Sequence, residues 1–232
     1  MPPTKPCNPR AARRSLLRRA VVHATALALV LFGGTACLHM KQELIIHRNG
    51  SARILLQYSL PTQAVEPVRQ AAQSLGNVDA DAQPAWWFNR DACAEALRDT
   101  GIDLERHRVY TADHRRHAVL QCRAEDLNAA LGNGPLKSFD LSETPEGHLK
   151  LTVQMPGLQD PENLARLPDD LRIELIITTP TAIVATTGTQ TEDRTAVWTV
   201  TSQTLRDAAL PECRVEFKPV GGVDRSSEGQ QE

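Results

Sequence analysis

Aromatic residues are scarce in this chain of 232 residues, since Phe, Trp and Tyr together make up 4% of it. Apart from one short apolar segment near the beginning, the sequence has no run of about 18 hydrophobic residues, so it predicts no membrane-spanning helix. Motifs of well-known reactions are also missing: there is no phosphate-binding P-loop, glycine-rich dinucleotide turn, Gly-x-Ser-x-Gly elbow or His-Glu-x-x-His zinc motif. The sequence therefore offers no catalytic residue to name and no cofactor to expect.

Five cysteines occur, and two of them, Cys7 and Cys37, fall within the first 37 residues. The other three, Cys93, Cys122 and Cys213, are an odd number, so in an oxidising compartment at least one of them forms no bridge within the chain. Cys122 lies on an apolar alternation and Cys93 on one face of an expected helix, which makes a disulfide between these two the most plausible bridge. The alternative, three buried thiols, is common for cysteine.

Acidic residues are missing from the first 36 positions, where six basic residues stand: Lys5, Arg10, Arg13, Arg14, Arg18 and Arg19. Residues 20–32 are mainly apolar, but this segment is too short to span a bilayer core, which takes a helix of about 20 apolar residues. A basic start, a short apolar segment and small residues are typical of a cleaved secretory signal. Arg13-Arg14 also resembles a twin-arginine export signal, with a general basic region as the alternative.

Small residues precede a cysteine at the end of this segment, in the order Gly34-Thr35-Ala36-Cys37. This tetrapeptide resembles the lipobox of bacterial lipoproteins, with Gly34 in place of the usual Leu, Val or Ile. The resemblance implies that residues 1–36 are a lipoprotein signal peptide and that the Cys37 thiol carries a diacylglycerol. It also implies a cell-envelope protein anchored in the bilayer, and in the outer membrane where the source has one, because the next residue is Leu38 and not Asp. A buried cysteine on an uncleaved helix is the alternative.

Cleavage before the cysteine would leave 196 residues, with 20 basic and 28 acidic side chains and a net charge of −8. Such a charge argues against nucleic acid as a partner and against electrostatic docking on anionic lipid. Residues 37–218 are expected to form an envelope domain, with a possible subdivision near 156–170, and residues 219–232 a disordered tail. Strand-like alternation begins at Leu38 without a polar tether, so we expect the domain to sit against the membrane.

Alternating apolar residues predict an α+β fold: a mostly antiparallel sheet built of hairpins, with two or three short helices packed on it, after an N-terminal signal helix. In the first hairpin, residues 38–60, a two-residue Asn49-Gly50 loop would set apolar residues against charged ones. A three-residue loop, Arg48 to Gly50 with Gly50 left-handed, instead pairs Leu44 with Ile54, and we predict this register. Because two strands alone are marginal in water, residues 171–177 or 195–200 should pair with the hairpin.

The rest of the chain shows further helix and hairpin patterns. Helices are expected at 62–75, at 90–100 with Asn89 as the N-cap, and at 125–131. Hairpins are expected at 102–123, at 136–155 and at 181–201, the last with a polar loop at 188–194, before a helical turn at 202–210 and a last strand at 213–218. Trp86, Trp87 and Phe88 form the most aromatic cluster, which we expect to pack in the core. An exposed membrane-side or ligand-binding patch is the alternative.

One predicted hairpin is strongly basic, because residues 102–110 and 117–123, with the turn at 112–116, carry Arg106, Arg108, Arg115 and Arg116. These four arginines are candidates for binding phosphate headgroups or polysaccharide, with a solvated turn as the alternative. His107, His114 and His117 lie in the same hairpin, and imidazoles suit zinc or copper, but the arginines oppose a cation. We therefore expect no metal site.

Taken together, the Cys37-Leu38 start, a strand pair around Asn49-Gly50, Phe88 before a helix and the late Val197-Trp198 strand resemble a loose class of bacterial lipoproteins of LppM type. This resemblance covers most of residues 37–200. It implies an α+β envelope domain that binds lipid or envelope components and has no established reaction. We therefore expect a non-catalytic binding or structural module for a lipid, a glycan or an envelope protein. A hydrolase or metal-dependent enzyme of unrecognised type is the alternative.

Overall fold

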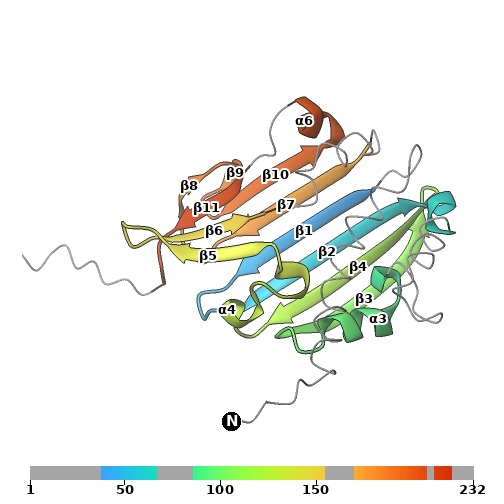
Figure 1. The fold of residues 1–232 in the computed structure, drawn as a ribbon, viewed down its shortest axis with the longest axis horizontal. Coiled ribbons are helices and arrows are strands. Elements are labelled where there is room, and N and C mark those ends of the chain that lie inside the picture. The colour runs from blue at the N-terminus through green and yellow to red at the C-terminus, as the bar shows by residue number, and fades with distance from the viewer. Residues whose placement is uncertain (1–37, 67–85, 155–169, 208–211, 221–232) are drawn as a thin grey trace, which may run out of the picture.

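Two β-sheets form the body of the protein in a computed structural model that describes residues 38–66, 86–154, 170–207 and 212–220 (Figure 1). The larger sheet has seven strands in the order β3-β4-β2-β1-β7-β10-β9. Its strands are β1 (His39–Ile46), β2 (Ala52–Pro61), β3 (Ile102–Ala112), β4 (Arg115–Ala124), β7 (Arg172–Thr178), β9 (Thr189–Glu192) and β10 (Thr195–Thr201). The smaller sheet, ordered β5-β6-β11-β8, consists of β5 (Phe139–Glu143), β6 (Leu149–Val153), β8 (Ile183–Thr186) and β11 (Cys213–Phe217).

The first hairpin adopts the predicted register. Leu44 pairs with Ile54, Ile46 with Ala52 and Met40 with Tyr58. The amide of His47 donates to the carbonyl of Ser51 at 2.9 Å, so the loop contains three residues, and Gly50 takes a φ of 84°. That left-handed conformation costs glycine little, which is why this loop length suits the sequence. Leu44 and Ile54 consequently lie fully buried on one face.

Strands from the far end of the sequence complete the larger sheet, as expected. β7 runs parallel to β1, pairing Met40 with Ile173, and β10 lies antiparallel to β7. On the other side of the hairpin, β4 lies antiparallel to β2 over its whole length, pairing Ile54 with Cys122. The hairpin thus occupies the centre of the sheet, and β1 is flanked on both sides by paired strands.

Each sheet contributes one face to a common core. The buried residues of β1, β2, β4, β7 and β10 form one apolar cluster with Leu151, Val215 and Phe217 of the smaller sheet. We call the face of the larger sheet that points into this cluster the inner face and the opposite face the outer face. Because the side chains of a strand alternate, every second residue of these strands belongs to the outer face.

Short helices close the inner side of the sheet. α3 (Arg90–Leu97) begins at Asn89, whose side chain accepts hydrogen bonds from the amides of Asp91 and Ala92 as predicted. Further short helices are η1 (Trp86–Phe88), α4 (Leu127–Ala130), η2 (Gly134–Leu136) and α6 (Ser202–Asp207). Trp87 and Phe88 are buried, and the Trp87 ring stacks on Tyr58 with ring centroids 4.7 Å apart. The core interpretation of these two aromatic residues is therefore confirmed.

One predicted hairpin is wrong, the pairing of residues 181–187 with 195–201. β8 instead pairs with β11 in the smaller sheet, and β9, which was expected to be a loop, pairs with β10. The chain passes from one sheet to the other at Gly188, directly over the Trp198 indole. A Cβ at Gly188 would lie 2.5 Å from Cε2 of Trp198, so only glycine fits there without a shift. Alternation alone does not reveal such a crossing.

The fold is the predicted α+β class, mostly antiparallel sheet with short helices. The smaller hairpin of β5 and β6 and the last strand, β11, also match the sequence analysis. Residues 62–66 form the start of the expected helix after β2. The signal segment 1–36, the possible subdivision near 156–170 and most of the 219–232 tail lie outside the described residues. Among those described, no helix is long and apolar enough to cross a membrane.

Candidate functional site

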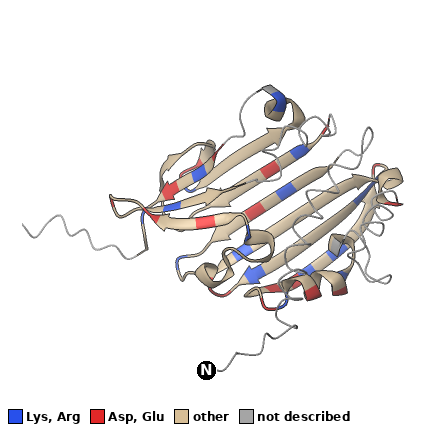
Figure 2. Ribbon diagram, viewed as in Figure 1, with Lys and Arg blue, Asp and Glu red and all other residues tan. Residues whose placement is uncertain are grey.

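The outer face of the larger sheet is where basic side chains gather. Across the five strands from β3 to β7 the strand register places seven basic residues there, namely Lys41, Arg53, Arg106, Arg108, Arg115, Arg123 and Arg172. The same five strands place four acidic residues there, namely Glu43, Asp103, Glu105 and Glu174. Figure 2 shows basic residues on each of these strands. This part of the face is net positive, whereas the chain after Cys37 is net negative.

A β-bulge turns two of the predicted arginines toward this face. The register of β3 against β4 shifts between Leu104 and Arg106, so that Glu105 is an extra residue. Leu104 opposes the buried Cys122, whereas Arg106 and Arg108 oppose outer-face residues of β4. Without the bulge, all three even-numbered residues would share one face.

The basic turn is tighter than the sequence indicated. The β3–β4 turn contains only Asp113 and His114, whose φ values are both positive, 50° and 57°. Two successive positive φ values are typical of a two-residue hairpin turn, in which Asp and related residues are tolerated. Arg115 and Arg116 therefore belong to β4 and point to opposite faces.

Arg115 and Arg116 make different contacts on the two faces of the sheet. On the outer face, Arg115 donates from Nε to the Ser59 hydroxyl at 2.6 Å and from Nη2 to the Ser59 carbonyl at 2.9 Å. On the inner side, the guanidinium of Arg116 lies over the Phe88 ring at 5.3 Å from its centroid. The four arginines thus form no common surface, because Arg116 packs on the core side while the other three lie on the outer face.

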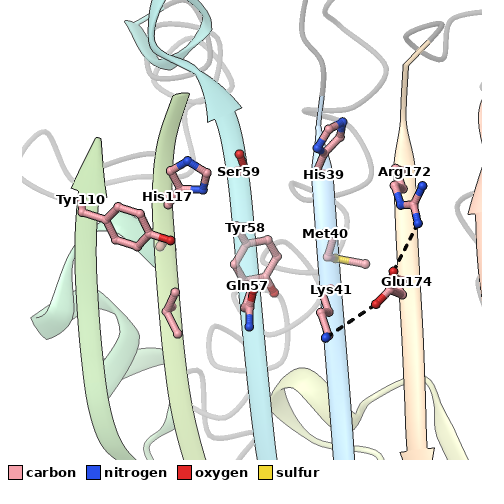
Figure 3. A pocket seen from close by; sticks show the side chains of 12 residues that line it. His39, Met40, Lys41, Gln57, Tyr58, Ser59, Tyr110, His117, Arg172 and Glu174 are labelled. Atoms are coloured by element: carbon pink, nitrogen blue, oxygen red, sulfur yellow. Dashed lines mark hydrogen bonds and ion pairs between the residues drawn. The ribbon is translucent and has the colours of Figure 1, made fainter. Parts of the chain in front are cut away.

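A shallow hollow of about 160 Å³ lies on the outer face, at the end where β1 begins (Figure 3). Its lining comes from β1, β2, β3, β4 and β7: His39, Met40, Lys41, Gln57, Tyr58, Ser59, Tyr110, His117, Ala118, Val119, Arg172 and Glu174. His117, Ser59, His39 and Arg172 stand side by side, because each of them pairs with the next across the sheet. We call these four residues the end row.

Glu174 is the only acidic residue among the described residues that line the hollow, and it has two basic neighbours. Lys41 Nζ lies 3.6 Å from Glu174 Oε1, and Arg172 Nη2 lies 3.4 Å from Glu174 Oε2 (Figure 3). The guanidinium of Arg172 is largely exposed, so this pair contributes little to stability. The described lining of the hollow therefore combines one carboxylate with two basic side chains, Lys41 and Arg172, and two imidazoles, those of His39 and His117.

Positive charge also acts on the imidazole of His39. Its pKa is lowered, first because the ring is partly buried, and then because Arg115, Arg172 and His117 are nearby, while Asp170 opposes this shift. Next to it, the rings of Tyr110 and His117 stack at 4.7 Å, and Arg108 lies over the Tyr110 ring at 5.0 Å. The stacking of Tyr110 on His117 and the contact of Arg108 with the Tyr110 ring hold these side chains in place on this side of the hollow.

The histidines of the predicted metal candidate do not converge. His107 lies on the inner face, where its Nε2 is 2.8 Å from the Trp87 carbonyl oxygen, whereas His117 lies on the outer face. His114 occupies the turn. Among the described residues, no group of three or more His, Cys, Asp or Glu side chains is arranged to hold a metal ion.

Cys93, Cys122 and Cys213 are all buried, and no disulfide joins them among the described residues. Burial, together with the neighbouring Cys122, raises the pKa of Cys93 to about 12, and burial raises that of Cys122 to about 12 as well. Both thiols are therefore protonated and unreactive at neutral pH. The Cys93–Cys122 bridge stays a prediction.

Sequence reasoning missed the end row, although each residue in it is visible in an alternating strand. His39 and Arg172 are polar positions in β1 and β7, strands that lie more than 130 positions apart in the sequence and are brought together by their parallel pairing. The lipidation candidate, Cys37, lies outside the described residues. Leu38, the next residue, is buried, and its carbonyl accepts a hydrogen bond from the Arg172 amide at 3.1 Å.

Comparison with known proteins gives little for this chain. No protein-family model matches it, and no curated protein does. Among solved structures, the NMR structure of the folded domain of Mycobacterium tuberculosis LppM aligns with 81% of this chain and 93% of its own, at 13% identity and a TM-score of 0.41. At this similarity the likeness bears on neither ligand nor activity.

Proposed function

We propose that the protein is an envelope lipoprotein, fixed to a membrane by acyl chains on Cys37, and that its sheet body is a non-catalytic binding or structural module. The observation that carries this proposal is the place where the candidate anchor joins the fold. Cys37 is followed at once by the buried Leu38 and by β1, which lies in the interior of the larger sheet. The tetrapeptide that ends in Cys37 supplies the expected processing site.

This attachment has a mechanical consequence. Leu38 is fixed by burial and by its bond to the Arg172 amide, and one peptide unit spans about 3.8 Å. Acyl chains on Cys37 would therefore hold the start of β1 at the membrane surface without a flexible tether. Two or more acyl chains anchor a protein stably, because each buried CH₂ contributes about 0.8 kcal/mol.

A binding role fits the body better than chemistry. The hollow on the outer face is shallow, the carboxylate of Glu174 is paired with Lys41 and Arg172, and the two histidines stand in the end row with Ser59 and Arg172. A general base or nucleophile needs a partner that activates it, whereas the Ser59 hydroxyl, which stands between the two histidines, accepts a hydrogen bond from Arg115 Nε at 2.6 Å. The arrangement favours recognition of a negatively charged group.

Cell fractionation of the full-length protein tests the proposal. We expect the wild-type protein to stay in the membrane fraction after washes with high salt and with alkaline carbonate, because acyl chains, unlike ion pairs, resist both. The Cys37→Ser variant should lose the acyl modification in metabolic labelling with a radioactive fatty acid, and Cys7→Ser, the matched control, should keep it. Equal labelling of the wild type and Cys37→Ser, or no labelling of either, would refute the anchor.

A further inference from the structure

We infer that the hollow beside the end row binds the phosphate of a phospholipid headgroup in the leaflet that holds Cys37. This inference rests on the proposed function, since it takes the acylated Cys37 as the anchor. It goes beyond it by assigning a ligand class, a phosphodiester, to a defined group of side chains: His39, His117, Arg172 and the hydroxyl of Tyr110.

Depth in the membrane is the first argument. His39 stands two residues after Cys37, so the chain between them spans at most about 7 Å. A bilayer of about 40–45 Å has a hydrocarbon core of about 30 Å, which leaves a headgroup layer of about 5–8 Å on each side. With acyl chains in the core and the thioether at its boundary, the end row lies at the depth of the phosphates.

Charge is the second argument. The outer face from β3 to β7 carries seven basic and four acidic residues, although the chain after Cys37 has a net charge of −8. The acidic body as a whole is repelled by anionic lipid, so this face is the one that turns toward it. The net charge alone argues against docking on anionic lipid, but the uneven distribution of charged residues makes such docking favourable at the end row.

Donor geometry is the third argument. Arg172 lines the hollow with an exposed guanidinium, whose Nη2 lies 3.4 Å from the carboxylate of Glu174. A guanidinium carries five N–H donors, so this contact leaves others for a ligand. The imidazoles of His39 and His117 come from two other strands, and the stacked Tyr110 brings a hydroxyl from a third. Donors from several strands around an open hollow suit a tetrahedral phosphate, which accepts hydrogen bonds on several oxygens.

The pKa of the His39 imidazole should change when a phosphate binds in the hollow. Its pKa is lowered by burial and by Arg115, Arg172 and His117, against the opposing Asp170. Lys41, on the same strand as His39, and Glu174, on β7, are the other charged groups that line the described part of the hollow. A bound phosphate adds negative charge beside the ring, favours its protonated form and raises its pKa.

The test uses the acylated protein, purified from membranes in maltoside micelles, which contain no phosphate, with ¹³C-labelled histidine. His39 and His117 resonances are followed by NMR during titration with dioctanoyl-phosphatidylglycerol, with inorganic phosphate and with dioctanoylglycerol, which lacks the phosphate. We expect the first ligand to shift both resonances and to raise the pKa of His39, and the third to leave them unchanged. The resonances of His47 and His148, which do not line the hollow, serve as internal references.

Two variants separate a defined site from diffuse charge. Arg172→Gln should weaken phosphatidylglycerol binding about five- to tenfold, the effect of losing a charge-assisted hydrogen bond at an exposed position. Arg53→Gln removes the same charge from the same face at the far end of β2 and should leave affinity unchanged. Equal weakening by both variants would overturn the site in favour of a general charge effect.

The other possible outcomes each refute a specific part of the proposal. An unmoved His39 resonance overturns the inference, and inorganic phosphate that binds as tightly as the lipid overturns the headgroup assignment. The intact mass of the same sample reports on Cys37. An acylated protein whose His39 does not respond refutes the hollow and leaves the anchor standing, whereas an unmodified Cys37 refutes the anchor and the headgroup assignment together.

Discussion

The crossing between the two sheets at Gly188 gives a prediction whose size follows from the structure. In Gly188→Ala, the new Cβ would lie 2.5, 2.8 and 2.9 Å from Cε2, Cδ2 and Nε1 of Trp198, well inside ordinary contact distances of 3.4–4 Å. The indole has little room to yield, because Trp198 is only 4% exposed and its Nε1 donates to the Thr187 hydroxyl at 3.2 Å. Something must shift, either the strand or the ring.

The expected cost combines two effects. Overpacking a well-filled site costs about 1–3 kcal/mol, and displacing the indole loses a hydrogen bond worth about 0.5–1.5 kcal/mol. We therefore expect Gly188→Ala to lower the free energy of unfolding by about 2–4 kcal/mol. Urea denaturation followed by far-ultraviolet circular dichroism measures this change without relying on tryptophan fluorescence.

A double-mutant cycle identifies the cause. Trp198→Leu removes the ring, so the penalty of Gly188→Ala should shrink by about 1–3 kcal/mol in that background. Gly50→Ala is the matched control: its φ is 84° and no heavy atom lies within 4 Å of the added Cβ, so its cost of about 1–2 kcal/mol comes from the backbone and should not depend on Trp198. A Gly188→Ala penalty below about 0.5 kcal/mol, or one that Trp198→Leu leaves unchanged, would refute the proposed packing.

Three further predictions concern the core, the thiols and a helix start. Leu44→Ala should lower the free energy of unfolding by about 2–5 kcal/mol, because Leu44 is fully buried, whereas Ile45→Ala on the outer face should cost clearly less; similar urea midpoints would contradict the assignment of faces. The raised pKa values of Cys93 and Cys122, about 12 against an ordinary value of 9, should leave both thiols of the reduced protein unalkylated by iodoacetamide at pH 8 in the native state and alkylated in urea. Since the unfolded thiols lose their protons first, stability should also fall as pH rises from about 9 toward 12, and less steeply in a Cys93→Ala/Cys122→Ala variant. Asn89→Ala should cost about 1 kcal/mol by removing the cap of α3, while Asn89→Asp should preserve it; equal losses in urea denaturation would speak against the cap.

The parts of the fold that local pattern and turn chemistry determine could be predicted. Leu44 and Ile54 had to share a face, and this requirement together with Gly50 fixed the loop length of the first hairpin. Asn89 marked the start of α3 because an asparagine side chain satisfies helix amides. The need of two strands for further partners predicted that residues 171–177 or 195–200 pair with the hairpin, and the first of these segments does so.

The parts that depend on long-range register could not be predicted. One extra residue, Glu105, reverses the faces of all the residues that follow it in β3. The two-residue turn of Asp113 and His114 places Arg115 and Arg116 in β4, where their side chains point to opposite faces. Both features change which arginines share a surface, yet neither leaves a clear mark in the sequence. The end row depends on three strand pairings, β4 with β2, β2 with β1 and β1 with β7, so its composition emerges only from the assembled sheet.

The central claim, that Cys37 is acylated and brings the start of β1 to a membrane, is tested most directly by the intact mass of the protein isolated from its native membranes. We expect a polypeptide that begins at Cys37 and carries the added mass of a diacylglycerol, with or without a further acyl chain. A polypeptide that still begins at Met1, or one that has an unmodified thiol at position 37, would contradict the claim.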